Sequence, residues 1–219
     1  MAESLEAVIG YRFSDPRLLK LALSHKSFAS ESGSGADNER LEFLGDSVLA
    51  AVVAHQLYSE YPDDPEGGLS KKKSLLVSRP SLAAWGEEIG LGAHLYLGVG
   101  EETSGGRTRQ SLLANAIEAV IGAMYLDGGY DAAATFVRDW CAKRHGSLFE
   151  TDHKSRLQEL LQKRHKMPPT YELDSTDGPD HDKTFKILVR IGDKELGRGT
   201  GKNKKEAEQA AACDALSRM

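Results

Sequence analysis

The chain has 219 residues, of which 28% are charged and 40% are hydrophobic, and its formal net charge at pH 7 is −5. This length supports one or two domains with at least one sizeable core. The only cysteines are Cys141 and Cys213, so we expect neither a disulfide framework nor a cysteine-bound metal. The N-terminal segment lacks a signal sequence, and no apolar run approaches the roughly 20 residues of a membrane span. These features predict a cytoplasmic protein.

The charge is divided unevenly along the chain. Residues 1–152 contain 14 Lys and Arg against 22 Asp and Glu, a net charge of −8, while residues 153–219 contain 14 against 11, a net charge of +3. Basic modules often bind phosphate backbones. We therefore expect two domains, residues 1–148 and residues 153–219, joined by a linker near 147–153.

The first domain is predicted to be helical throughout. One helix begins at Pro16, after the N-cap candidate Asp15. Residues 29–37 have the composition of a loop. Further helices are expected over residues 39–60, 69–78, 80–89, 109–127 and 130–145, with Gly-rich turns at 98–109 and 127–130. Trp85 and Trp140 are expected in the core.

The second domain has a different rhythm. Residues 155–165 form an amphipathic helical pattern, and residues 203–219 form an Ala-rich one. Between them, the segments 169–177, 183–192 and 194–201 alternate apolar and polar residues, as half-buried strands do. The predicted order is α-β-β-β-α, and we assign Tyr171, Phe185 and Ala211 to its core.

Three acidic residues lie at helical spacing in the segment 38–49, NERLEFLGDSVL. Glu39, Glu42 and Asp46 occupy positions i, i+3 and i+7, which places them on one stripe of a helix. Like charges at these spacings repel, and a hard cation such as Mg²⁺ or Mn²⁺ would neutralise them because it prefers oxygen ligands. The alternative is a solvated helix face, which the spacing alone favours.

A polar pair interrupts the apolar segment 111–127, SLLANAIEAVIGAMYLD. Asn115 and Glu118 are three residues apart and should either be buried with partners or face a site. If Glu118 packed beside the first stripe, it would complete a cluster of four carboxylates suited to divalent ions and phosphoryl transfer. A single Glu on the surface of a helix is the alternative.

Four stretches of the chain together resemble bacterial ribonuclease III. They are NERLEFLGDSVL, EGGLSKKKSLLVS, residues 97–130 and the α-β-β-β-α tail, in the order found in the family. The resemblance implies an all-α endonuclease domain followed by a small α+β double-stranded RNA-binding domain. It further implies a homodimer that cuts both strands of double-stranded RNA, including rRNA and mRNA precursors, to leave 5′-phosphate and 3′-hydroxyl ends. It implies that the protein neither associates with a membrane nor acts on a small-molecule substrate.

The resemblance also assigns roles to residues. Glu42, Asp46 and Glu118 fall on the family's metal-coordinating carboxylates, and Glu39 falls on a nearby acid that supports the site. The implied reaction is hydrolysis assisted by Mg²⁺, with Mn²⁺ as an alternative. Phe43 matches an aromatic residue of the family's dimer interface, although by itself it would be read as a core residue.

Asn115 departs from the family pattern, which has Asp at this position. Its amide still offers a carbonyl oxygen to a metal, but it brings no negative charge and does not act as a base at neutral pH. The hypothesis is that the site binds divalent ions less tightly and cleaves slowly or not at all. The rival function is therefore a cleavage-deficient dimer that binds double-stranded RNA; a helical scaffold with fortuitous acids would not explain the RNA-binding module.

The second domain offers three candidate RNA contacts. A protein that recognises duplex RNA bridges two shallow minor grooves and the phosphates between them. The lysines in GKNKKEAEQ precede or begin a helix, where backbone N–H groups and the helix dipole also favour phosphate. The resemblance maps RNA contacts onto Gln158 and Glu159, the loop 178–181 with His181, and the cluster of Lys202, Asn203, Lys204 and Lys205.

Four further residues have no settled role in the sequence. His25 is more typical of a structural histidine than of a catalytic one. Arg107 and Arg109 would either steer RNA phosphates or belong to a solvated loop, and Glu101 lies in the same segment.

Overall fold

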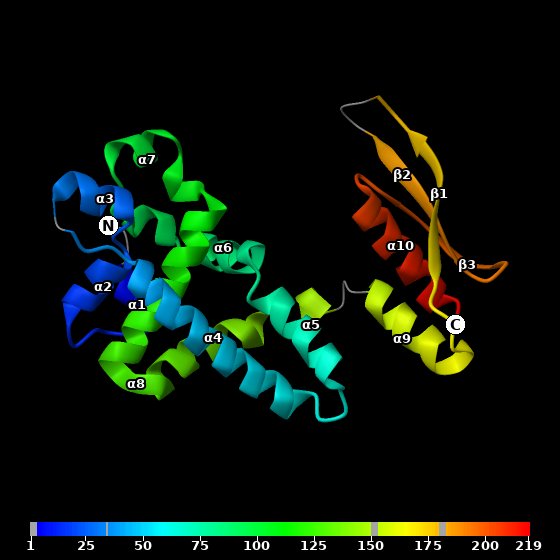
Figure 1. Ribbon diagram of the computed structural model, residues 1–219, viewed down its shortest axis with the longest axis horizontal. Coiled ribbons are helices and arrows are strands. Elements are labelled where there is room, and N and C mark those ends of the chain that lie inside the picture. The colour runs from blue at the N-terminus through cyan, green and yellow to red at the C-terminus, as the bar shows by residue number, and fades with distance from the viewer. Residues whose placement is uncertain (1–3, 34, 150–152, 180–182) are drawn as a thin grey trace. The chain divides into compact units, whose positions relative to one another are not determined.

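The computed structural model describes residues 4–33, 35–149, 153–179 and 183–219. The chain divides into two compact units, residues 1–145 and 146–219 (Figure 1). The first unit is helical, and the second has the order α-β-β-β-α, so the fold class predicted from the sequence is confirmed. Within the described residues, no helix is both long enough and apolar enough to cross a membrane.

The first unit contains two long helices and several short ones. The α-helices are α1 (Leu5–Ile9), α2 (Pro16–Ala22), α3 (Lys26–Ser32), α4 (Glu39–Glu60), α5 (Glu66–Leu76), α6 (Arg79–Glu88), α7 (Val99–Thr103) and α8 (Gln110–Phe149). Two 3₁₀ helices, η1 (Leu91–His94) and η2 (Gly106–Thr108), complete it.

Two local expectations need correction, and a third is confirmed. The loop predicted over residues 29–37 begins only at Gly33, whose φ of 67° ends α3 in the left-handed region. The Gly-rich segment 98–109 contains α7 and η2. The turn predicted at 127–130 is confirmed: Gly129, with φ 78° and ψ −172°, separates two helical segments that together are labelled α8. Glycine spacing marked these breaks without showing how much helix lay beside them.

The core of the first unit is built around α8. Ala116, Ile117, Val120 and Ile121 are completely buried, so this helix is enclosed on more than one side. The two tryptophans assigned to the core lie there: Trp85 and Trp140 stack with ring centroids 4.4 Å apart.

Helices α4 and α8 cross in direct backbone contact (Figure 1). A β-carbon on Gly45 would overlap the backbone oxygen of Glu118, and one on Gly122 would lie 3.1 Å from the backbone nitrogen of Gly45. Only glycine leaves room for two helices at this separation. The crossing sets the acidic stripe of α4 beside Glu118.

The second unit is a three-stranded antiparallel sheet packed against two helices. Its elements are α9 (His153–His165), β1 (Thr170–Asp177), β2 (Thr184–Ile191), β3 (Lys194–Gly201) and α10 (Lys204–Ser217), with strand order β1-β2-β3. Val189 pairs with Tyr171 on one side and Gly197 on the other. Ala211 is buried as expected, and Tyr171 and Phe185 are partly buried against the same core.

A glycine–alanine contact joins β3 to α10. Gly197, Gly199 and Gly201 alternate along β3 and face α10, where a β-carbon on any of them would meet the helix. The opposing residues of α10 include Ala207, Ala211 and Ala215, which recur every four positions and are completely buried. This contact holds the start of α10, and with it the lysine cluster, against the end of β3.

Candidate active site and RNA-binding surface

The acidic stripe of α4 begins at a helix end that is fixed by buried hydrogen bonds. Asn38, which is 5% exposed, donates from its side chain to the Ala22 carbonyl at 3.1 Å and from its backbone to the Ser24 carbonyl at 2.9 Å. Glu39 follows at the first helical position, exposed to solvent. The start of α4 is therefore anchored, and the stripe has a defined orientation.

The structure brings Glu118 within electrostatic reach of the stripe. Burial raises the pKa of Glu118 to about 7, and the carboxylates of Asp46 and Glu42 add to this effect, while the Arg79 guanidinium opposes it. The sequence singled out three of these side chains as metal ligands. Their electrostatic coupling follows from the crossing at Gly45 and Gly122 rather than from the spacing along either helix.

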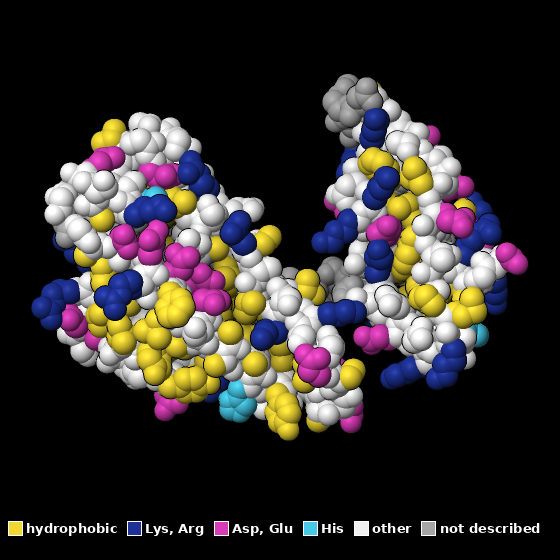
Figure 2. All heavy atoms as spheres, in the orientation of Figure 1, with side chains coloured by type: hydrophobic (Ala, Val, Ile, Leu, Met, Phe, Trp, Pro, Cys, Tyr) yellow, Lys and Arg dark blue, Asp and Glu magenta, His cyan; other side chains and the backbone are white. Residues whose placement is uncertain are grey.

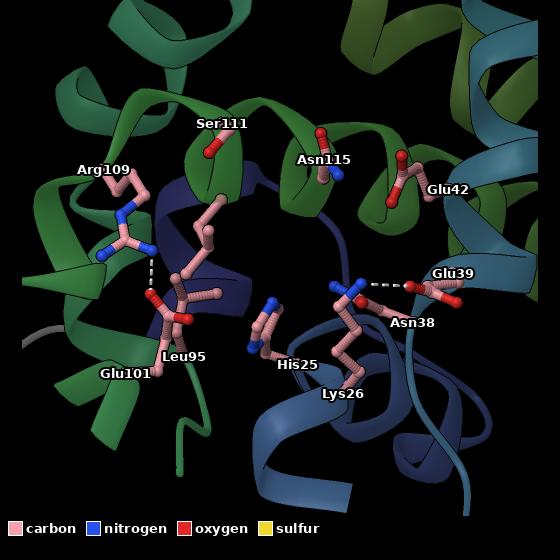
Figure 3. Close-up of a pocket in the computed structure, with 11 residues that line it drawn as sticks. His25, Lys26, Asn38, Glu39, Glu42, Leu95, Glu101, Arg109, Ser111 and Asn115 are labelled. Carbon is pink, nitrogen blue, oxygen red and sulfur yellow. Dashed lines mark ion pairs between the residues drawn. The ribbon is translucent and has the colours of Figure 1, made fainter. Parts of the chain in front are cut away.

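Asn115 lies on the same side of α8, one turn before Glu118. It lines a cavity of about 290 Å³ together with Glu39 and Glu42, and Figure 3 shows its amide directed toward Glu42. Burial raises the pKa of Glu42, whereas hydrogen bonding with the Asn115 side chain lowers it. The amide thus interacts favourably with a carboxylate that an aspartate at position 115 would repel.

The cavity contains cations as well as acids. It is lined by His25, Lys26, Asn38, Glu39, Glu42, Leu95, Glu101, Arg109, Ser111, Leu112 and Asn115. Lys26 pairs with Glu39 at 3.1 Å, and Arg109 pairs with Glu101 (Figure 3). Asp46 and Glu118 are not among the lining residues, so the acids predicted to act together lie partly in the cavity and partly beside it.

The donor set suits a hard divalent cation. Glu42, Asp46 and Glu118 offer carboxylate oxygens, and beyond the effect of burial, Asp46 and Glu42 raise the pKa of Glu118 while Asp46 contributes to that of Glu42. A bound cation would relieve this excess of negative charge. Across the described residues, no three His, Cys, Asp or Glu side chains are gathered at the spacing of metal ligands, so the fit to a cation rests on the chemistry and charge of these donors and not on a formed coordination geometry.

His25 has an evident structural role. It is the N-cap of α3, where its Nδ1 accepts the Ser27 N–H at 3.3 Å and lies 2.8 Å from the Ser27 hydroxyl. The same hydroxyl accepts the Gly98 N–H at 2.9 Å. Desolvation lowers the pKa of His25, which favours the neutral ring. His25 therefore helps to join α3 to the segment that leads into α7.

Arg107 and Arg109 are held by nearby groups. Arg107 contacts Glu102 at 2.6 Å through both Nε and Nη2, and its Nη1 donates to the carbonyls of Gly92, Ala93 and Leu95. Arg109 pairs with Glu101 and donates to the Ser104 hydroxyl at 2.9 Å. Both arginines thus organise the loop ahead of α8.

Sequence reasoning missed two cations next to the acids, Lys26 and Arg79. Lys26 directly follows His25 in the sequence, but its ion pair with Glu39 forms only because α3 packs near the start of α4. Arg79, the first residue of α6, influences Glu118 from 39 positions away in the sequence. Neither position carried a motif from which this proximity could be read.

Phe43 lies on α4 between the acidic residues and points away from the core. Its side chain is 78% exposed, the highest value among the large hydrophobic residues that the structure describes as exposed. The prediction of a core position, which the sequence around Phe43 gives when taken by itself, is therefore wrong for the isolated chain. Figure 2 shows hydrophobic side chains next to the acidic region of the first unit.

The second unit presents polar groups along α9. Gln158 and Glu159 are exposed, whereas Leu157 and Leu161 are buried in the core. A shallow depression of about 350 Å³ is lined by Gln158, Glu159, Gln162, Lys163 and Lys166, the last three of which the sequence had not indicated. His181 lies outside the described residues.

The lysine cluster surrounds the first turn of α10. Asn203 is the N-cap: its Oδ1 accepts the Glu206 N–H at 2.9 Å, while Glu206 accepts the Lys202 N–H at 3.0 Å. The arrangement differs from a capping box, because Glu206 accepts the N–H of the residue before the N-cap and not that of Asn203 itself. Lys202, Lys204 and Lys205 are all exposed. Asn203 thus has a structural task in addition to its proposed contact with RNA.

Comparisons with known proteins match both units. Residues 15–145 match the family model Ribonuclease-III-like, and residues 153–219 match the model Double-stranded RNA binding motif. Ribonuclease 3 of Caldanaerobacter subterraneus subsp. tengcongensis is 47% identical over 224 residues, which cover 100% of this chain and 98% of the relative. Ribonuclease 3 of Treponema denticola is 49% identical over 208 residues, which cover 93% and 85%.

A solved structure matches the first unit. The nuclease domain of ribonuclease III from Campylobacter jejuni, described with structural flexibility in its region of dimer formation, aligns with a TM-score of 0.61 at 41% identity. The alignment covers 64% of this chain and 94% of that domain. Together with the full-length relatives and the two family models, this places the chain in the ribonuclease III family of endoribonucleases, with a double-stranded RNA binding motif at its C-terminal end.

Proposed function

We propose that this chain is a cytoplasmic, homodimeric endoribonuclease that cuts structured RNA, such as rRNA and mRNA precursors, in double-stranded segments. The observation that carries the proposal is the crossing of α4 and α8, which couples Glu42 and Asp46 to Glu118. A double-stranded RNA binding motif in the same chain supplies the substrate class. The products would have 5′-phosphate and 3′-hydroxyl ends.

Glu42, Asp46, Asn115 and Glu118 are the residues that would hold Mg²⁺, or Mn²⁺ in its place. When bound, such an ion supplies a water molecule of lowered pKa and stabilises charge on the phosphate. Glu39 would support the site from the cavity wall, where it already pairs with Lys26. Asp46 and Glu118 would act with Glu39 in catalysis by orienting the water and the scissile phosphate.

The second unit would hold the duplex. Gln158 and Glu159 on α9 and His181 in its loop would contact the minor grooves and their 2′-hydroxyl groups. Lys202, Lys204 and Lys205 would bind the phosphates between the grooves, assisted by the N-terminal end of α10. Asn203 would join them while it caps the helix.

Dimerisation would bury Phe43. Covering an aromatic side chain that is 78% exposed removes a large apolar surface from water, which stabilises an interface. The Campylobacter relative is described as having a region of dimer formation in its nuclease domain. In this chain, Phe43 would pack across the equivalent contact.

Asn115 raises a second candidate function. Because an amide brings no charge to the metal, the site would bind divalent ions less tightly than one with aspartate and would cleave slowly. In the extreme case the chain would bind duplex RNA as a dimer without cutting it. Glu42 links these residues, because it forms a hydrogen bond with Asn115 and, together with Asp46, acts on Glu118.

The deciding experiment is cleavage of a long RNA duplex by the wild-type chain and by Asn115→Asp. Cleavage in Mg²⁺ that disappears on chelation, with 5′-phosphate ends, supports the endonuclease. A faster Asn115→Asp variant supports impairment, whereas equal and full rates in both would exclude it. Duplex binding without cleavage by the wild type, together with cleavage by the variant, identifies the binding-only dimer.

A further inference from the structure

Lys26 lies at the rim of the cavity beside the acidic stripe (Figure 3). Its Nζ is 3.1 Å from Oε1 of Glu39, and no other ion pair is described for it. The Lys26 and Glu39 side chains are 65% and 56% exposed, respectively. An ion pair this exposed is screened by water and contributes little to the stability of a fold.

The position of Lys26 in its own helix is also unfavourable. Lys26 is the first residue of α3, directly after the N-cap His25. Helix N-termini carry partial positive charge and disfavour cations. Neither the helix nor the salt bridge therefore accounts for a lysine at this place, whereas a negatively charged ligand at the cavity rim would.

The cavity has one other described cation among its lining residues, and it is held more firmly. Arg109 pairs with Glu101 and also donates to the Ser104 hydroxyl and carbonyl. To release Arg109 would break several interactions, whereas to release Lys26 would break one. Lys26 is accordingly the cation of this cavity that can change partner at the lowest cost.

We propose that Lys26 positions the RNA by exchanging Glu39 for a phosphate oxygen of the strand to be cut. In the free protein, Lys26 pairs with Glu39 at the cavity wall. Divalent ions held by Glu42, Asp46 and Glu118 would weaken the negative field that retains Lys26, and the entering phosphate would then take the place of Glu39. This inference rests on the proposed function, because it needs RNA at the acidic stripe.

The first test measures duplex RNA affinity in EDTA and in Ca²⁺, a divalent probe that tolerates carboxylate geometries too irregular for Mg²⁺. In Ca²⁺, Lys26→Gln should weaken binding by about three- to tenfold. It should also reduce the slope of log affinity against log salt concentration by about one released counterion. In EDTA its affinity should equal that of the wild type. Lys26→Arg keeps the charge and should restore the Ca²⁺ affinity.

A matched control is Lys20→Gln, since Lys20 lies on α2 outside the cavity, with its Nζ 6.0 Å from the Tyr96 ring centroid. It should behave as the wild type in both solutions. An unchanged Ca²⁺ affinity in Lys26→Gln would overturn the proposal. An equal loss of duplex affinity in EDTA and in Ca²⁺ would also overturn it, because Lys26 would then contact phosphate whether or not divalent ions are present.

A second test releases Lys26 directly. Glu39→Gln should raise duplex affinity in EDTA by about three- to tenfold if it frees the ammonium group, and the gain should vanish in the double variant with Lys26→Gln. A gain that persists in the double variant would exclude exchange between these two residues. Unfolding midpoints equal to the wild type would show that each variant folds.

Cleavage separates this inference from the proposed function. In Mg²⁺, Lys26→Gln should raise KM more than it lowers kcat, because the lysine binds substrate without taking part in the chemical step. If the wild type failed to cut any duplex, the proposed function would fail, while the affinity comparison would still decide the role of Lys26. A fall in kcat alone, with KM unchanged, would contradict the positioning role.

Discussion

Gly45 of α4 lies against the backbone of Glu118 in α8, so closely that a β-carbon at position 45 would overlap the Glu118 carbonyl oxygen. The same β-carbon would lie 2.9 Å from the Gly122 nitrogen. Both neighbours are backbone atoms, which do not move aside as a flexible side chain would. The close approach of the two helices, which brings the acids together, therefore requires glycine at position 45.

Gly45→Ala should destabilise the protein and separate the acids. We expect the free energy of unfolding to fall by about 3 kcal/mol, at the upper end of the cost of overpacking, as measured by urea denaturation. Gly67→Ala is the control, because Gly67 lies in α5 and a β-carbon added there would have nothing within 4 Å, so this variant should be neutral or slightly stabilising. Equal stability of Gly45→Ala and wild type would contradict the backbone contact.

Glu118 should make the stability of the metal-free protein depend on pH. Its pKa rises from 4.5 to about 7 on folding, so the folded state binds more protons between these values and stability falls as pH rises through this window. Glu118→Gln should therefore stabilise the metal-free protein at pH 8, on the order of 1 kcal/mol after allowance for solvent screening.

The measurement is thermal unfolding in EDTA at pH 8 and pH 5. The stabilising effect of Glu118→Gln at pH 8 should shrink at pH 5, where the wild-type carboxyl is largely protonated. Added Mg²⁺ should stabilise the wild type more than the variant at pH 8, because the variant lacks one charged ligand. A pH-independent difference would exclude ionisation of Glu118 as its cause.

Phe43 should contribute to self-association. Phe43→Ala is expected to raise the dimer dissociation constant by more than about tenfold, since a buried aromatic anchor is among the most costly interface residues to remove. Sedimentation velocity over a dilution series measures this. Tyr58→Ala is the matched control, because Tyr58 is 73% exposed on the same helix but lies about four turns from Phe43. Unchanged dissociation of Phe43→Ala would remove it from the interface.

The lysine cluster should control the salt dependence of RNA binding. Lys204→Ala with Lys205→Ala should weaken duplex binding and flatten the dependence of affinity on salt by about two counterions. The control is Lys194→Ala, because Lys194 begins β3 at the end opposite to α10's first turn. A slope that stays at the wild-type value in the double variant would place these lysines outside the interface.

The secondary structure of both domains was largely readable from local patterns. The apolar spacing of residues 39–60 predicted α4 with its observed ends, and the alternation of residues 183–192 predicted β2 within two residues of its observed ends. The short helices were less readable. Residues 99–103, VGEET, contain one glycine and no apolar periodicity, yet α7 forms there because Ser27 and Glu31 accept backbone N–H groups at its N-terminus, Glu31 that of Val99 at 2.8 Å.

The sequence by itself determined the residue types of the site: carboxylates at helical spacing on two helices, an amide at position 115, and lysines around the first turn of α10. These follow from periodicity and chemistry along one segment at a time. The tertiary structure decided which of them interact, because Gly45 and Gly122 permit the backbone contact that couples Glu118 to Asp46. It also placed Lys26 beside Glu39 and committed Arg109 to Glu101, since charges from different elements meet only when those elements pack.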